Sequence, residues 1–168
     1  GSKEQHPRWR RSVNLVNGVL GEALGEVYVK RHFSPESKEK MAQLVKNLQV
    51  ALGERIASLD WMSDATKAKA QEKLNAFTVK IGYPDKWRDY SKLAISADKS
   101  FYENLKEVTR FEQDFNMSEL GKPVDRERWL MNPQDVNAYY MPTTNEICFP
   151  AGILQPPFFN PNADDAVN

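Results

Sequence analysis

The stretch "DVNAYYMPTTNEICFPAGILQPPFF", Asp135 to Phe159, decides the fold, because its residue pattern differs from that of the chain before it. From Val136 to Met141 the residues alternate with a period of two, which is typical of a β-strand. A short run from Glu146 to Phe149 follows the turn-forming residues Pro142 to Asn145. The pattern predicts a β-hairpin with a turn of about four residues.

Three prolines mark the segment after this hairpin: Pro150, Pro156 and Pro157. Proline cannot donate a ladder hydrogen bond, so the segment is not expected to be a central strand. We expect an ordered, extended loop. A two-stranded hairpin is marginally stable by itself, so it must pack on helices or join a larger sheet.

Helical spacing dominates the chain before the hairpin and predicts four helices. Ser34-Pro35-Glu36 combines an N-cap, a first-turn proline and an early acid, which indicates a helix start. Tyr83 precedes Pro84, so the stretch from Ile81 to Trp87 is expected to be a loop. The four expected helices run from Trp9 to His32, from Pro35 to about Leu59, from about Ala65 to Phe77, and from about Lys99 to Phe115.

Three glycines lie inside the first expected helix: Gly18, Gly21 and Gly25. Each would cost roughly 1 kcal/mol relative to alanine at an exposed helix position. We therefore expect them to permit close packing of another element. The predicted fold class is α+β and predominantly α-helical, with about four helices followed by a β-hairpin and an ordered proline-rich loop.

Composition excludes several classes of protein. Lys plus Arg and Asp plus Glu both number 23 in 168 residues, so no net field would attract nucleic acid. No apolar run approaches the roughly 20 residues that a membrane span needs, so we expect no membrane contact. Cys148 has no partner for an internal disulfide and is expected to be a small buried apolar residue.

Two stretches together resemble the neprilysin-type zinc endopeptidases, a family that includes endothelin-converting enzymes and bacterial oligopeptidases. They are "VNAYY", residues 136–140, and the eleven consecutive residues "FPAGILQPPFF", 149–159. Three further segments resemble family segments in the same order: "RWRRSVNLVNGVLGEALGEVYV" (8–29), "LDWMSDATKAKAQEKL" (59–74) and "IGYPD" (81–85). The resemblance therefore spans nearly the whole chain.

The resemblance implies a catalytic zinc held by an H-E-x-x-H helix, in which two histidines share one helix face and the glutamate polarises the attacking water. This sequence contains no such motif, and its two histidines, His6 and His32, have no ligand spacing. We therefore expect an internal fragment of a peptidase that is inactive alone. It should contain no catalytic residue and no metal ligand, and the parent protein should supply the zinc.

The same resemblance implies a substrate-binding role for the C-terminal part. Residues matching Asn137 and Ala138 lie on an edge strand and hold the backbone of the bound peptide. Residues matching Ile153 and Phe158 line the apolar pocket for the side chain after the cleaved bond. Without the resemblance, Asn137 is an ordinary polar strand residue, and Ile153 and Phe158 are equally compatible with the core.

The predicted organisation has three parts. Residues 1–2, Gly-Ser, are typical of a tag scar, 3–127 form a helical region, and 128–168 form the hairpin and substrate-binding shoulder. The substrate expected for the parent is a short peptide. The alternative function is a non-catalytic helical protein-interaction module that associates through the edge of the hairpin.

Two further expectations concern the environment of the protein. Self-association is expected through the hairpin and the loop from Gly152 to Phe159, because a fragment exposes apolar surface that its parent covers. Ser12 stands where many secreted animal members have cysteine, which favours the disulfide-free bacterial branch. A periplasmic or cell-envelope location is favoured, with a cytoplasmic one left open.

Overall fold

The structure is a computed structural model that describes residues 4–168. Its described part contains five helices and a three-stranded sheet, so it is α+β and predominantly helical, as predicted. The helices are α1 (Arg8–Val19), α2 (Gly21–His32), α3 (Pro35–Ser58), α4 (Asp64–Asn75) and α5 (Phe101–Ser118). The strands are β1 (Thr78–Gly82), β2 (Tyr139–Met141) and β3 (Glu146–Pro150). None of the described helices is both long and apolar enough to span a bilayer.

The single helix predicted from Trp9 to His32 is wrong, because the structure divides it into α1 and α2. The chain leaves helical geometry at Leu20, with φ −135° and ψ 35°. Of the three glycines, Gly21 and Gly25 pack closely as expected: a Cβ atom on Gly25 would lie 2.7 Å from Cδ of Pro133. The break and the two glycines bring α2 against the segment that precedes the hairpin. Gly18 has no such neighbour.

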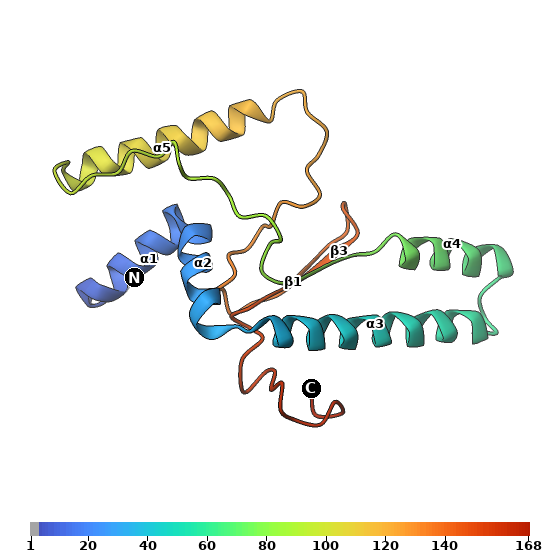
Figure 1. Ribbon diagram of the computed structural model, residues 1–168. Helices are drawn as coiled ribbons and strands as arrows, with labels where there is room; N and C mark the ends of the chain where they lie inside the picture. The colour runs from blue at the N-terminus through green and yellow to red at the C-terminus, as the bar shows by residue number, and fades with distance from the viewer. Residues whose placement is uncertain (1–3) are drawn as a thin grey trace.

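The other three helices confirm the predictions, and each begins at a serine cap. Ser34 accepts a hydrogen bond from the backbone N–H of Ser37 at the start of α3, and Ser63 caps α4 in the same way. The Ser100 side chain and Glu103 form a reciprocal capping box at α5. Figure 1 shows α3 and α4 side by side at one flank of the sheet, while α5 lies apart from them.

The sheet has the strand order β1-β3-β2, with β3 parallel to β1 and antiparallel to β2. Strand β1 was not predicted, and its last two residues, Ile81 and Gly82, were wrongly assigned to a loop. The hairpin does join a larger sheet, as its marginal stability required. Since β1 and β3 are distant in sequence, no turn signal between them indicates the pairing.

The predicted hairpin is present, but its first strand begins at Tyr139 rather than Val136. Tyr139 pairs with Cys148, so continuing the register would place Asn137 opposite Pro150. Proline has no N–H to donate, so the ladder cannot extend to this position. The prediction that Asn137 and Ala138 lie on the edge strand is therefore wrong: both lie immediately before it.

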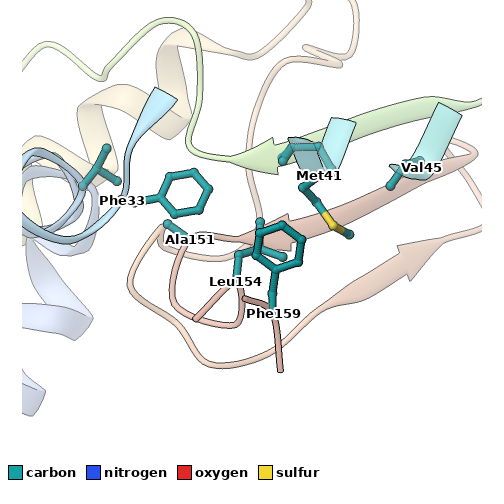
Figure 2. Packing of buried hydrophobic residues seen from close by; sticks show 8 residues of the cluster. Phe33, Met41, Val45, Ala151, Leu154 and Phe159 are labelled. Carbon is teal, nitrogen blue, oxygen red and sulfur yellow. The ribbon is translucent and has the colours of Figure 1, made fainter. Parts of the chain in front are cut away.

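The core lies between α2, α3, the sheet and the loop after β3. Figure 2 shows side chains from these elements converging on one apolar cluster. The cluster consists of Val29, Phe33, Met41, Val45, Ile81, Ala151, Leu154 and Phe159. The loop after β3 is ordered but not extended, because it folds into successive turns that bury Leu154 and Phe159.

An open apolar groove of about 420 Å³ lies between α3, α4 and the hairpin. Leu48 and Leu52 continue the apolar face predicted for α3, but they line this groove and remain at least half exposed. Phe77 and Tyr140 stack on each other at the same groove, with ring centroids 6.0 Å apart.

Candidate substrate-binding site

Asn137 and Ala138 lie in a short segment, Val136–Ala138, that leads into β2. Val136 and Asn137 are exposed and Ala138 is partly buried. The side-chain oxygen of Asn137 accepts a hydrogen bond of 2.8 Å from the backbone N–H of Ala138. Asn137 thus faces solvent at the edge of the sheet, where its carboxamide is accessible to a ligand.

The residues immediately before this segment are tied to the junction of α1 and α2. The side-chain amide of Gln134 donates hydrogen bonds to Oδ1 of Asn17 and, at 2.8 Å, to the carbonyl of Gly21. Asn132 donates from its side chain to the Asn17 carbonyl at 3.2 Å, and from its backbone to the Asp135 carboxylate at 2.8 Å. We call Asn132–Asp135, together with its contacts to the α1–α2 junction, the helix anchor.

The loop after β3 touches the helix anchor at Gly152. The Gly152 N–H donates a 2.8 Å hydrogen bond to the carbonyl of Pro133. A Cβ atom on Gly152 would collide with the carbonyl oxygen of Gln134 and lie 2.6 Å from that of Asp135. This contact brings the segment that carries Asn137 beside the loop that carries Ile153.

The two predicted pocket residues have different environments. Ile153 is partly buried and packs against the core cluster. Phe158 is 61% exposed, whereas its neighbour Phe159 is 3% exposed. The structure therefore places Phe158 in solvent and Phe159 in the core.

A chain of polar side chains, from the partly buried Tyr139 to the buried Glu146 and Lys80, crosses the sheet. The Glu146 carboxylate accepts a hydrogen bond of 2.9 Å from the Tyr139 hydroxyl and one of 3.0 Å from Nζ of Lys80. Lys80 also donates to the carbonyl of Arg128 at 2.8 Å. We call Lys80, Glu146 and Tyr139 the sheet anchor.

The electrostatics of the sheet anchor favour an ionised Glu146. Desolvation opposes ionisation, but hydrogen bonds from Lys80 and Tyr139 outweigh it and hold the pKa of the Glu146 carboxyl below its ordinary value. Desolvation and the bond to Glu146 raise the pKa of the Tyr139 phenol, so it stays protonated and donates. Burial raises the pKa of the fully buried Cys148 thiol to about 12, which makes it an unreactive packing residue, as predicted.

Among the residues that the structure describes, no set of side chains fits zinc. Across residues 4–168, no three His, Cys, Asp or Glu side chains gather where they could hold a metal ion. His6 is exposed near the start of the described chain, and His32 ends α2.

Sequence reasoning missed both anchors. Lys80 between Val79 and Ile81 offered a signal, because a lysine enclosed by strand-forming residues needs a partner when buried. Glu146 is the first residue of a predicted strand, but nothing in the sequence aligned it with Lys80. For Asn17 and Gln134, more than a hundred residues apart, we find no signal in the sequence.

Comparison with known proteins shows the family of this chain. Two models described as peptidase family M13 match the chain, one over residues 1–84 and one over residues 137–168. Endothelin-converting enzyme-like 1 of Mus musculus is 38% identical over 164 residues, which cover 95% of this chain and 21% of that protein. Neprilysin of Oryctolagus cuniculus is 35% identical over 176 residues, covering 100% of this chain and 23% of that protein.

Solved structures give the same result. The zinc metalloprotease Zmp1 of Mycobacterium tuberculosis in its open state is 51% identical, with a TM-score of 0.90 over 99% of this chain and 26% of that one. PepO from Lactobacillus rhamnosis is 32% identical, with a TM-score of 0.83 over 90% of this chain and 24% of that one. The chain spans about a quarter or less of the length of these relatives.

The described part of the chain has helices around a small three-stranded sheet, and an exposed segment leads into its edge strand. The chain belongs to peptidase family M13, the neprilysin-type family that its sequence resembles.

Proposed function

We propose that this chain is the substrate-binding part of a zinc-dependent endopeptidase that cleaves short peptides. The observation that carries the proposal is the exposed Asn137 carboxamide, two residues before the edge strand β2, in a family of zinc metalloproteases. A carboxamide can donate to and accept from one peptide unit, so it suits the backbone of an extended peptide.

In this proposal, Asn137 binds the peptide backbone, and the partly buried Ala138 leaves room for close approach. The local hydrogen bond from the Ala138 N–H occupies only the Asn137 oxygen. Its side-chain nitrogen donates to no other residue in the described part of the chain and is available to a peptide carbonyl.

Ile153 and Phe158 are proposed to contact the side chain that follows the cleaved bond. Phe158 is exposed and able to contact a ligand directly. Ile153 is on the core side of the same loop, where it would form the base of an apolar surface. This arrangement favours peptides with an apolar side chain at that position.

We assign the zinc to residues of the longer polypeptide, since the relatives are about four times the length of this chain. When bound, zinc would activate the water that attacks the peptide bond. The residues of this chain would hold the peptide in register with that centre, and the chain alone would not hydrolyse peptides.

The test is Asn137→Ala in the full-length enzyme. The variant loses a hydrogen bond that both binds the peptide and positions it for cleavage. Its kcat/KM on a short peptide should therefore fall by about 10- to 100-fold. The melting temperature should stay unchanged, because the side chain is exposed. Undiminished kcat/KM, or a fall that follows a lowered melting temperature, would contradict the assignment.

Asn116→Ala supplies a matched control. Asn116 is an exposed asparagine on α5, which lies apart from the hairpin. This variant should retain the kcat/KM of the unmodified enzyme. A loss seen only in Asn137→Ala is then due to the location of Asn137 and not to the removal of a surface amide as such.

A further inference from the structure

The sheet anchor begins at Tyr139, the residue that follows the candidate substrate-binding segment, and the proposed function leaves it unused. We propose that Tyr139 and Glu146 are positioning residues that hold Val136–Ala138 where Asn137 meets the peptide backbone. This inference rests on the proposed function, because it gives these residues a role only through Asn137.

The strand register shows how one carboxylate can fix three strands. Tyr139, Cys148 and Lys80 are opposite one another on β2, β3 and β1. Glu146 lies two residues before Cys148 on the middle strand, on the same face of the sheet. One of its oxygens accepts from Tyr139 and the other from Lys80, so the carboxylate joins β2 to β1 across β3.

Burial makes this connection firm. Glu146 is 3% exposed and Lys80 is 6% exposed, so water cannot replace either partner without opening the sheet. Lys80 is fixed further by its bond to the Arg128 carbonyl, in the segment that leads towards the hairpin. The Tyr139 hydroxyl therefore meets an acceptor that has little freedom to move.

The Val136–Ala138 segment is held at both of its ends. Tyr139 follows Ala138 directly and is bound to the sheet anchor, while Asp135 precedes Val136 and belongs to the helix anchor. Three residues between two fixed points have few conformations, although the side chains of Val136 and Asn137 are exposed. The position of Asn137 is thus set by groups that it does not touch.

A merely structural ion pair would stabilise the fold without affecting how Asn137 meets the substrate. The two roles are separated by Tyr139→Phe in the full-length enzyme, which removes only the hydroxyl. We expect kcat/KM on a short peptide to fall about 5- to 10-fold at temperatures well below unfolding, since misplacement of a binding group slows the reaction.

The decisive measurement is the double variant Tyr139→Phe with Asn137→Ala. If Tyr139 acts through Asn137, the hydroxyl should matter little once the carboxamide is absent, and the double variant should lie within about twofold of Asn137→Ala alone. Equal fold-losses from Tyr139→Phe in both backgrounds would overturn the positioning role.

Tyr140→Phe is the matched control. Its hydroxyl lies 3.3 Å from Oδ1 of Asn145, its side chain is exposed, and it is outside the sheet anchor. Because it removes a hydroxyl from the adjacent residue of the same strand, it should leave kcat/KM unchanged. An equal loss in Tyr140→Phe would overturn the proposal, because any change in β2 would then be sufficient.

Glu146→Gln provides a second test, measured at a temperature at which this less stable variant is fully folded. It keeps one accepting oxygen for Tyr139 but removes the charge, so kcat/KM should also fall and the loss should again vanish in the Asn137→Ala background. If Asn137→Ala lowers kcat/KM but neither anchor variant does, the positioning role fails and the proposed function stands. If Asn137→Ala has no effect, both fail.

Discussion

Two regions meet at the candidate site and are held in place by different forces. The Asn132–Tyr139 segment is fixed by polar contacts at both ends. Its first residues bind the α1–α2 junction in the helix anchor, and Tyr139 binds Glu146 in the sheet anchor. The Ala151–Phe159 loop is fixed mainly by apolar burial, with Ala151, Leu154 and Phe159 in the core cluster.

The difference explains how both regions can expose a candidate contact residue without losing order. Directional hydrogen bonds specify a position, whereas burial supplies most of the free energy of folding. We therefore expect changes in the loop to lower stability, and changes in the polar segment to alter the position of Asn137 more than the stability.

Phe159→Ala should have the largest effect on stability. Removal of a phenylalanine from a packed core costs about 3–5 kcal/mol, through lost transfer free energy and the cavity left behind. Urea denaturation of the chain measures this loss. Phe158→Ala is the control, since its side chain is mostly exposed and should change the free energy of unfolding by less than about 0.5 kcal/mol. Equal losses in the two variants would contradict the division between core and surface in this loop.

Glu146→Gln should lower the free energy of unfolding by about 3 kcal/mol near pH 7, because it leaves the buried Lys80 without a counter-ion. The loss should depend on pH. Since the folded state lowers the pKa of Glu146 from 4.5, its contribution is complete above that value and disappears as the pH falls through the folded-state pKa.

The measurement for Glu146 is the difference in unfolding free energy between the unmodified chain and Glu146→Gln from pH 7 to pH 3. The difference should narrow in acid, and shifts at other carboxyl groups cancel between the two proteins. A difference that stays constant would mean that folding does not shift the pKa of Glu146.

Gly152→Ala tests the contact between the two regions. Its new methyl group would meet backbone carbonyl oxygens of the helix anchor, which cannot rotate away as a side chain can. We expect a loss of about 2 kcal/mol, within the range for overpacking. Gly18→Ala is the control, because a Cβ there meets nothing within 4 Å, and it should be neutral or stabilising. Unchanged stability in Gly152→Ala would show that the two regions do not touch as described.

Asn17→Ala should have the smallest effect. It removes one acceptor of the Gln134 amide but leaves the Gly21 carbonyl, so the cost should be about 1 kcal/mol. Urea denaturation checks it. A loss as large as that of Phe159→Ala would show that polar contacts supply most of the stability of this segment. That result would contradict the view that they mainly set its position.

The sequence predicted the features that local chemistry determines. Helical spacing located α3, α4 and α5, a serine cap marked the start of α3, and the residues Pro142–Asn145 located the turn of the hairpin. Features that depend on distant pairing were missed. The parallel strand β1 has no turn to indicate it, and the break at Leu20 has no proline.

The candidate site shows the same division. The resemblance identified Asn137, Ala138, Ile153 and Phe158 as contact residues, and their roles stay predictions. The predicted strand boundary was wrong because the register of the hairpin, if continued, would place Asn137 opposite Pro150, which has no N–H to donate. The anchors could not be predicted because each joins groups from elements far apart in the sequence.

The most direct test of the account is a structure of the full-length enzyme with a bound, uncleavable peptide analogue. We predict that the Asn137 side-chain nitrogen lies about 3 Å from a backbone carbonyl of the peptide, while the Tyr139 hydroxyl remains bound to Glu146. A peptide bound elsewhere, with the Asn137 carboxamide still in solvent, would contradict the account.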